Sequence, residues 1–283
     1  MPLVSCKEIL NPARHKGIGV PGVDVIDHAS TEGVLSAAES LQLPIILMVP
    51  ETAFPMLNVK AFFKYLIERA KSASVPVAVH LDHGESIETI KMAIESGFSS
   101  VMIDGSALPL DENIALTKSV VELAHSAGVS VEAEIGHVGG GEGCLEGSEV
   151  DEDLFTRPED AQRFARETGV DTLAVAFGTV HGIFKGTPKL DIQRLEQISD
   201  GVDIPLVMHG GSGLSDEQYV SVIKAGITKI NLFTEISMTA AEAAIEHGLK
   251  ADKKLHFAEL VLIGQKTTEA LTAKYLKLFS SFK

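Results

Sequence analysis

The chain has 283 residues, 45% of them hydrophobic, a length that suits one α/β barrel as well as two smaller domains. Asp and Glu (39) outnumber Lys and Arg (24), and the formal net charge of −15 argues against binding to nucleic acid or an anionic membrane, which need basic patches. No apolar run approaches the ~20 residues of a membrane helix, and no signal peptide is evident. Because only Cys6 and Cys144 occur, far apart, we expect a reducing cytoplasm rather than a disulfide framework.

Helix-like and strand-like segments alternate along the sequence. The first half is expected to contain a helix over residues 1–13, a strand within 17–25, a helix over 30–41, a strand over 44–49, a helix over 54–73, a strand over 76–81, a helix over 86–96, a strand over 99–103 and a helix over 113–127. Ser30 or Thr31 is the expected cap of the second helix.

The second half continues the alternation. It is expected to contain a strand over 129–135, a glycine-rich acidic segment over 136–155, a helix over 157–168, a strand over 172–177, a helix over 191–199, a strand over 205–208, a helix over 215–225, a strand over 228–232, a helix ending near 247 and a mostly helical tail over 251–283. About eight β-α units in one chain predict a single (β/α)8 barrel domain over residues 1–283 with a C-terminal helical extension. A doubly wound sheet is the alternative, but no glycine-rich dinucleotide turn follows the first strand.

Polar side chains gather where these strands end, and the carboxyl ends of barrel strands meet at one face. They are Asp82 and His83 on the third strand, Asp104 on the fourth, Glu132 and Glu134 on the fifth, His181 on the sixth and His209 on the seventh. Each histidine alone is equally well explained as a hydrogen-bonded polar group. Three imidazoles converging with an open fourth position are typical of catalytic zinc, so the barrel prediction carries a metal prediction with it.

Two glycine-rich segments add to this face. His209-Gly210-Gly211-Ser212-Gly213 opens a helix, where glycines permit close backbone approach and the helix N-terminus favours an anion, and Asn231 and Thr234 follow the eighth strand beside it. The loop 139–143 has the composition of a lid, on which Glu142 is either an acid/base group or a solvated carboxylate.

Taken together, these residues resemble the class II, zinc-dependent fructose- and tagatose-bisphosphate aldolase family over essentially the whole barrel. The segments that carry the resemblance are 79–83 (VHLDH), 101–106 (VMIDGS), 131–136 (VEAEIG), 178–182 (GTVHG), 209–213 (HGGSG) and 229–231 (KIN).

The resemblance implies a role for each site residue. His83, His181 and His209 would hold Zn²⁺, which would polarise the ketose carbonyl and stabilise the enediolate of dihydroxyacetone phosphate. Asp82 would exchange the proton of the C4 hydroxyl, and Glu142 the proton at the dihydroxyacetone phosphate carbon. The other roles implied are Asp104 and Glu134 as supporting or alternative metal carboxylates, Gly182, Gly210, Gly211, Ser212, Asn231 and Thr234 as the phosphate site, and the main-chain carbonyls near Val180, Gly182 and Gly210 as ligands of a monovalent cation, Na⁺ or K⁺.

The sequence departs from the family pattern around the far end of the sugar. Asp24 replaces the usual Asn, Pro50 replaces a phosphate-contacting Ser of some members, and Lys253 and Lys254 stand where an arginine is usual. Asp24, Lys253 and Lys254 are therefore candidate substrate contacts. The function predicted is reversible cleavage of a ketose 1-phosphate or 1,6-bisphosphate to dihydroxyacetone phosphate and an aldehyde, with fructose 1,6-bisphosphate expected to be a poor substrate. The partner predicted is a small sugar phosphate, with a homodimer or homotetramer as the assembly. A barrel metallohydrolase and a non-catalytic sugar-phosphate-binding barrel remain as alternatives, although the first strand lacks the His-x-His pair of the former.

Overall fold

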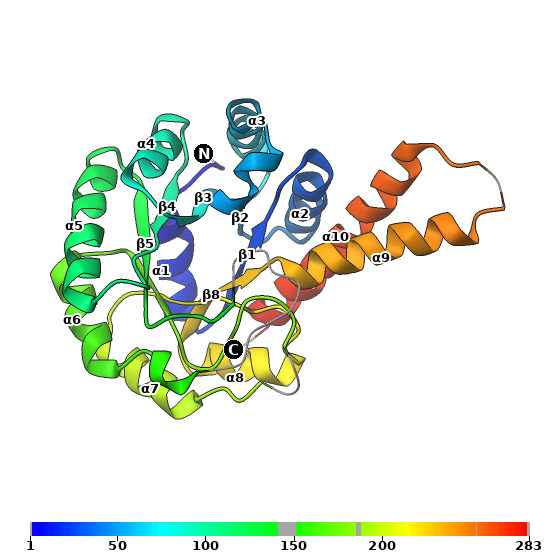
Figure 1. Cartoon of the computed structure of the whole chain (residues 1–283). Helices are drawn as coiled ribbons and strands as arrows, with labels where there is room; N and C mark the ends of the chain where they lie inside the picture. The colour runs from blue at the N-terminus through cyan, green and yellow to red at the C-terminus, as the bar shows by residue number, and fades with distance from the viewer. Residues whose placement is uncertain (1, 141–150, 185–187, 253, 282–283) are drawn as a thin grey trace.

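The computed structural model describes residues 2–140, 151–184, 188–252 and 254–281, and its centre is a closed barrel of eight parallel strands (Figure 1). The strands are β1 (Val20–Asp24), β2 (Ile45–Pro50), β3 (Val77–Gly84), β4 (Ser100–Ile103), β5 (Ser130–Ile135), β6 (Thr172–Val175), β7 (Leu206–Met208) and β8 (Ile227–Leu232). Each strand pairs with the next, and β8 closes on β1 through the register Val20↔Lys229. The predicted barrel is confirmed.

The helices are α1 (Cys6–Lys16), α2 (His28–Leu41), α3 (Val59–Ser72), α4 (Ile87–Glu95), α5 (Leu110–Ser126), α6 (Pro158–Thr168), α7 (Ile192–Gly201), α8 (Asp216–Lys224), α9 (Thr234–Lys250) and α10 (Phe257–Ser280), with short 3-10 turns at Glu51–Met56 and Glu152–Leu154. Helices α2 to α8 connect the strands and lie around the barrel, whereas α1 precedes β1 and α9 and α10 follow β8 (Figure 1). Every residue of every strand is buried, which accounts for their continuous apolar runs.

Several helix boundaries differ from those predicted, because local caps decide them. The second helix begins at His28, where Asp27 accepts a 2.7 Å hydrogen bond from the backbone N–H of Ser30, so neither Ser30 nor Thr31 is the cap. The first helix begins only at Cys6, because Ser5 caps it and Leu3 forms a bridge with β3. The helix predicted over 54–73 is split in two, since Asn58 caps α3 after the 3-10 turn.

The C-terminal extension forms an arm. Figure 1 shows α9 and α10 running side by side away from the barrel, with the loop between them at the outer end, while the second half of α10 returns to pack beside α2. The predicted helical extension is therefore present, and its outer half has little of the chain to pack against.

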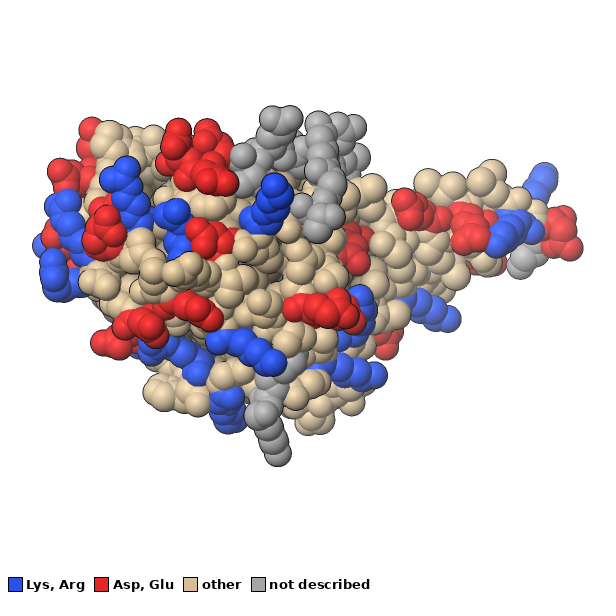
Figure 2. Space-filling model, turned by 90° about the horizontal axis from the view of Figure 1, so that it is seen from below, with Lys and Arg blue, Asp and Glu red and all other residues tan. Residues whose placement is uncertain are grey.

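Two surface properties agree with the composition. None of the helices in the described part of the chain is both long and apolar enough to span a membrane. On the face seen in Figure 2, acidic and basic side chains are interspersed, and no broad basic area appears there.

Candidate active site

The end of β3 places Asp82 and His83 side by side at the carboxyl end of the barrel. In a regular strand, two consecutive side chains would point to opposite faces. Here the pairing of β3 with β4 shifts register between Leu81 and Gly84, and His83 adopts a left-handed backbone with φ of 45°. Such a conformation costs a non-glycine residue free energy, and it is found most often at functional sites.

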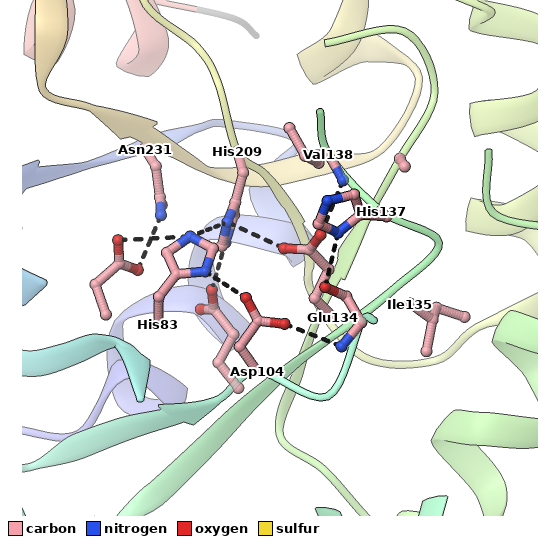
Figure 3. Close-up of polar contacts among 12 residues, drawn as sticks. His83, Asp104, Glu134, Ile135, His137, Val138, His209 and Asn231 are labelled. Carbon is pink, nitrogen blue, oxygen red and sulfur yellow. Dashed lines mark hydrogen bonds and ion pairs between the residues drawn. The ribbon is translucent and has the colours of Figure 1, made fainter. Parts of the chain in front are cut away.

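Three histidines that follow or end separate strands, His83 on β3, His181 in the loop after β6 and His209 after β7, come together here, as the sequence predicts. Figure 3 shows two of them, His83 and His209. The rings of His83 and His209 are 4.6 Å apart, and that of His181 lies 5.2 Å from His83 and 5.9 Å from His209. One nitrogen of each ring lies within 4.8 Å of the other two. The three imidazoles therefore converge on one point from three strands.

Carboxylates fix which nitrogen faces that point. Asp104 Oδ2 lies 2.7 Å from His83 Nδ1, and Glu132 Oε1 lies 3.0 Å from His209 Nε2. The opposite nitrogens, His83 Nε2 and His209 Nδ1, are 2.9 Å apart. Histidine ligands of metals commonly have their second nitrogen held by a carboxylate in this way.

The donor set fits zinc. A carboxylate oxygen of Glu134 lies 3.3 Å from His209 Nδ1, which adds an oxygen donor to the three imidazoles, and zinc accepts nitrogen and oxygen ligands of this kind. Burial raises the pKa of Glu134 to about 7. Burial also opposes ionisation of Asp104, but its hydrogen bond with His83 outweighs this and holds the Asp104 pKa below its ordinary value.

A buried ion pair lies beneath the histidines. Lys229 Nζ lies 2.8 and 3.0 Å from the two carboxylate oxygens of Glu132, and both side chains are fully buried in the barrel. The same carboxylate contacts His209, so the ammonium group supports a metal-facing imidazole through one intermediate residue.

Asp82 lies beside His83 and is held by Asn231. The side-chain amide of Asn231 donates a 3.1 Å hydrogen bond to Asp82 Oδ1, and Oδ2 lies 3.9 Å from His83 Nε2 (Figure 3 shows Asn231 beside His83). A carboxylate oxygen adjacent to the metal-facing imidazole is well placed to exchange a proton with a bound ligand.

The residues predicted as a phosphate site line one small pocket. Its lining comprises Asp24, His181, Gly182, Gly210, Gly211, Ser212, Asn231, Leu232, Phe233 and Thr234. Gly210 has φ of 63°, and a Cβ there would lie 2.3 Å from the carbonyl oxygen of Val180, so glycine is required for this approach. The structure thus brings the six predicted phosphate residues and Asp24 together.

The remaining predicted residues lie elsewhere. Lys254 lies in the loop between α9 and α10, at the outer end of the arm and away from this pocket (Figure 1). Lys254 is not among the residues that line this pocket, and its contact with substrate stays a prediction. Glu142, the loop 141–143 and Lys253 lie outside the described residues.

Sequence reasoning placed Glu132 at this face without assigning it a role, and it gave no role to Lys229, His137 or Ser106. Ser106 Oγ lies 3.1 Å from His137 Nδ1, and the backbone N–H of Ser106 donates to Asp104 Oδ1, so this pair continues the hydrogen bonding behind His83. A lysine within the apolar strand 227–232 was the one available sequence signal for the buried ion pair.

An eight-stranded barrel that presents three imidazoles, an adjoining carboxylate and an anion pocket at one face has the architecture of the metal-dependent aldolases. The chain belongs to the class-II fructose-bisphosphate aldolase family, whose model matches residues 4–283, and it is an aldolase, a carbon–carbon lyase.

Relatives and solved structures agree with this assignment. The chain is 44% identical to a probable fructose-bisphosphate aldolase of Bacillus subtilis over 250 residues, covering 87% of this chain and 86% of the relative. It is 42% identical to a fructose-bisphosphate aldolase of Geobacillus stearothermophilus, with 87% and 86% coverage. The crystal structure of the YdjI aldolase from Escherichia coli K12 superposes with a TM-score of 0.88 at 32% identity, covering 99% of this chain and 98% of that one. The family assignment favours an aldolase over a barrel metallohydrolase.

Proposed function

We propose that this chain is a zinc-dependent aldolase that reversibly cleaves a ketose 1-phosphate into dihydroxyacetone phosphate and an aldehyde. The observation that carries the proposal is the juxtaposition of three converging imidazoles with Asp82 on one side and a glycine-lined anion pocket on another. Each part corresponds to one requirement of the reaction: an electrophile for the carbonyl, a proton acceptor for the hydroxyl and a cradle for the phosphate.

His83, His181 and His209 would hold the zinc ion, and Glu134 and Asp104 are the carboxylates beside it. Zinc would supply a Lewis acid for the ketose carbonyl. Asp104 and Glu132 hold the ring orientations of His83 and His209, so each imidazole presents its other nitrogen toward the proposed metal position.

Asp82 is the proposed proton acceptor for the C4 hydroxyl in cleavage and the donor in condensation. The hydrogen bond from Asn231 occupies one carboxylate oxygen, which directs the other toward the imidazoles. Glu142 is proposed to exchange the proton at the dihydroxyacetone phosphate carbon, a role that would separate the two proton transfers between two carboxylates.

The phosphate is proposed to bind among Gly182, Gly210, Gly211, Ser212 and Thr234, with Asn231 at the border between this pocket and Asp82. A monovalent cation, Na⁺ or K⁺, is proposed at the carbonyls of Val180, Gly182 and Gly210. The close approach of Gly210 to the Val180 carbonyl supports this, because it brings two of these three residues into contact.

The proposed substrate has no phosphate at its far end. Pro50 lies opposite Asp82 in the β2–β3 register and has neither a hydroxyl nor an N–H to donate. The next residue, Glu51, is acidic, and its carboxylate accepts 2.8 Å hydrogen bonds from Glu85 N–H and the Thr89 hydroxyl. A second phosphate beside this carboxylate would be repelled unless a cation intervened.

The proposed assembly is a homodimer, or a homotetramer built from it, formed through the arm. Four apolar side chains near the arm's outer end are more than half exposed: Ile245 (61%), Leu249 (82%), Phe257 (80%) and Leu262 (52%). An apolar groove at the base of the same arm is lined by Ile236, Ala240, Ala244 and Val261 among others. A patch and a groove on one chain suit a two-fold contact in which each copy supplies both.

The oligomer proposal is tested by measuring mass in solution. Leu249→Glu and Phe257→Glu should shift the chain toward monomer in light scattering, whereas Met56→Glu should not, although Met56 is 70% exposed on another surface. A wild-type chain that is monomeric at micromolar concentration would contradict it.

The proposed compartment is a reducing cytoplasm. Cys6 is a free thiol that is fully buried against the barrel, and burial raises its pKa to about 12, so it is an unreactive core residue. Thiol labelling in cell fractions would test the redox state of both cysteines.

The function itself is tested by a coupled assay for dihydroxyacetone phosphate across a panel of ketose 1-phosphates and 1,6-bisphosphates. Turnover of at least one ketose 1-phosphate is expected. Binding of sugar phosphate without turnover of any of them, by metal-loaded protein, would instead support a non-catalytic binding protein.

A further inference from the structure

The glycine-rich turn that follows β7 is fixed from behind by the first turn of α9. The backbone N–H of Gly213 donates a 3.0 Å hydrogen bond to Glu235 Oε2, and the backbone N–H of Glu235 donates a 3.2 Å hydrogen bond to Ser212 Oγ. This reciprocal pair has a chemical consequence. Ser212 Oγ accepts the bond from Glu235 through a lone pair, which leaves its O–H to donate into the pocket that it lines.

The contacts continue to α10. The hydroxyl of Tyr275 donates a 2.5 Å hydrogen bond to the same oxygen, Glu235 Oε2, and Tyr219 on α8 donates a 2.5 Å hydrogen bond to the carbonyl of Gly211. The two tyrosine rings are fully buried, meet edge to face at 5.5 Å and both contact Phe279. Two of the three tyrosines in the chain therefore hold one turn.

The position of Glu235 needs an explanation beyond anion binding. Its carboxylate uses the N–H of Gly213, which is then not available to a phosphate, and it places a negative charge near an anion pocket. What Glu235 supplies instead is a fixed conformation of the turn. Gly210 and Gly213 both have positive φ, and glycines in such turns lose much conformational freedom when they are fixed.

We propose that Glu235 and Tyr275 are positioning residues for the phosphate turn. Their hydrogen-bonded pair holds residues 210–213 in the phosphate-binding conformation before the substrate arrives. Binding therefore does not include the entropic cost of ordering the turn, and the affinity for phosphate is higher. The pair also makes α10, the helix that ends the described chain, a part of the substrate site. This inference rests on the proposed phosphate site.

The test compares two variants with a matched control. Tyr275→Phe keeps the buried ring and removes only the hydroxyl. Tyr65→Phe removes an equivalent bond elsewhere, since the Tyr65 hydroxyl donates to Glu32 Oε1 at 2.7 Å between α2 and α3. The full chain is titrated with inorganic phosphate by calorimetry, and kcat and KM are measured with the best ketose 1-phosphate.

Tyr275→Phe should raise the Kd for phosphate and the KM about tenfold, the effect of losing one hydrogen bond to a charged group, with a smaller change in kcat. Hydrogen exchange should accelerate in a peptide covering residues 210–214. Tyr65→Phe should leave the Kd for phosphate, the KM and the hydrogen exchange of residues 210–214 unchanged. The melting temperatures of both variants serve as the stability control. Each variant loses one tyrosine–glutamate hydrogen bond, so the two melting temperatures should be similar.

Glu235 provides a rescue pair. Glu235→Leu removes the acceptor and should weaken phosphate binding at least as much as Tyr275→Phe. Glu235→Gln keeps one oxygen that can accept from both Gly213 and Tyr275, so phosphate binding should return to the wild-type level or become tighter, because a negative charge is removed.

The outcomes separate the two proposals. If wild-type protein binds phosphate and all the variants bind it equally, the positioning role is wrong and the phosphate site stands. If wild-type protein fails to bind inorganic phosphate and Ser212→Ala leaves KM unchanged, the phosphate site is wrong and the positioning role falls with it.

Discussion

Lys229 Nζ and the carboxylate of Glu132 form a two-pronged ion pair, at 2.8 and 3.0 Å, inside a barrel where neither side chain has any solvent exposure. Removing one partner of such a pair leaves the other charge buried and unpaired. Lys229→Met should therefore lower the free energy of unfolding by about 3–5 kcal/mol, measured by urea denaturation.

A second variant separates charge from shape in this pair. Lys229→Met combined with Glu132→Gln leaves no unpaired charge and keeps an oxygen that can accept from His209 Nε2. This double variant should recover most of the lost stability and retain metal binding. A double variant no more stable than Lys229→Met would show that the loss came from packing.

The metal prediction concerns the three converging histidines. The protein should purify with about one zinc per chain and lose activity to a chelator. His181→Ala should weaken zinc binding by more than the ~10–100-fold lost when only a supporting partner is removed, whereas His247→Ala, on an exposed part of α9, should retain it. Elemental analysis and a competition titration measure both, and full turnover by metal-free protein would contradict the assignment.

Replacing each of the two proposed acid/base residues should abolish a different proton transfer. Asp82→Ala should abolish most C–C cleavage while proton exchange on dihydroxyacetone phosphate remains measurable. Glu142→Ala should lose that exchange. Each loss should reach the ~10²–10⁴-fold typical of a general acid or base. Isotope exchange followed by NMR, beside the cleavage assay, distinguishes them, and an identical pattern for both variants would refute the division of roles.

The part of the enzyme that contacts the far end of the sugar should discriminate against a second phosphate. An arginine would bind a phosphate through two parallel hydrogen bonds. This chain instead has Pro50 and Glu51 at the end of β2, and Lys254 lies on the arm. Fructose 1,6-bisphosphate should be a poor substrate: losing one charge-assisted contact costs roughly 1.5–3 kcal/mol, or about one to two decades in kcat/KM.

Comparison of fructose and tagatose 1,6-bisphosphates with the matching 1-phosphates measures this preference. Pro50→Ser should narrow the difference, because it supplies a hydroxyl and an N–H at the end of β2. A bisphosphate preferred by two decades in the wild type would show that other groups replace the arginine.

Stability should depend on pH through Asp171, which is remote from the histidines. Burial would raise its pKa, but hydrogen bonds from Lys7, the Val131 N–H and His125 lower it below the ordinary value. A carboxyl whose folded pKa is depressed stabilises the fold above its unfolded pKa of ~3.9, and the contribution is lost as pH falls toward the folded pKa. Asp171→Asn should therefore be less stable than wild type by about 2 kcal/mol at pH 7. The difference in urea midpoints should shrink below about pH 4, and a constant difference would contradict the pKa argument.

The sequence by itself determined the barrel and predicted which strand-end residues would share its carboxyl face. Buried parallel strands need unbroken apolar runs, so the eight strands could be read as such runs, and polar residues directly after them had to share the carboxyl face. His83, His181 and His209, the glycine turn after β7 and Asn231 followed from position alone. The cap of α2 was misassigned by three or four residues, because Asp27, Ser30 and Thr31 are all of cap-forming types and only the geometry of the loop chooses among them.

Tertiary structure decided which groups touch. The pairing of Lys229 with Glu132 and the bond from Asn231 to Asp82 each join strands that are far apart in sequence, and no local pattern specifies them. The register shift at His83 lies between the consecutive strands β3 and β4, but it too depends on how the two strands pair. The same holds for Tyr275, which reaches Glu235 across 40 positions because α10 folds back on the barrel. Lys254 shows the reverse case: a residue placed near the site by resemblance is carried to the end of an arm, since the direction in which α9 leaves the barrel is set by packing.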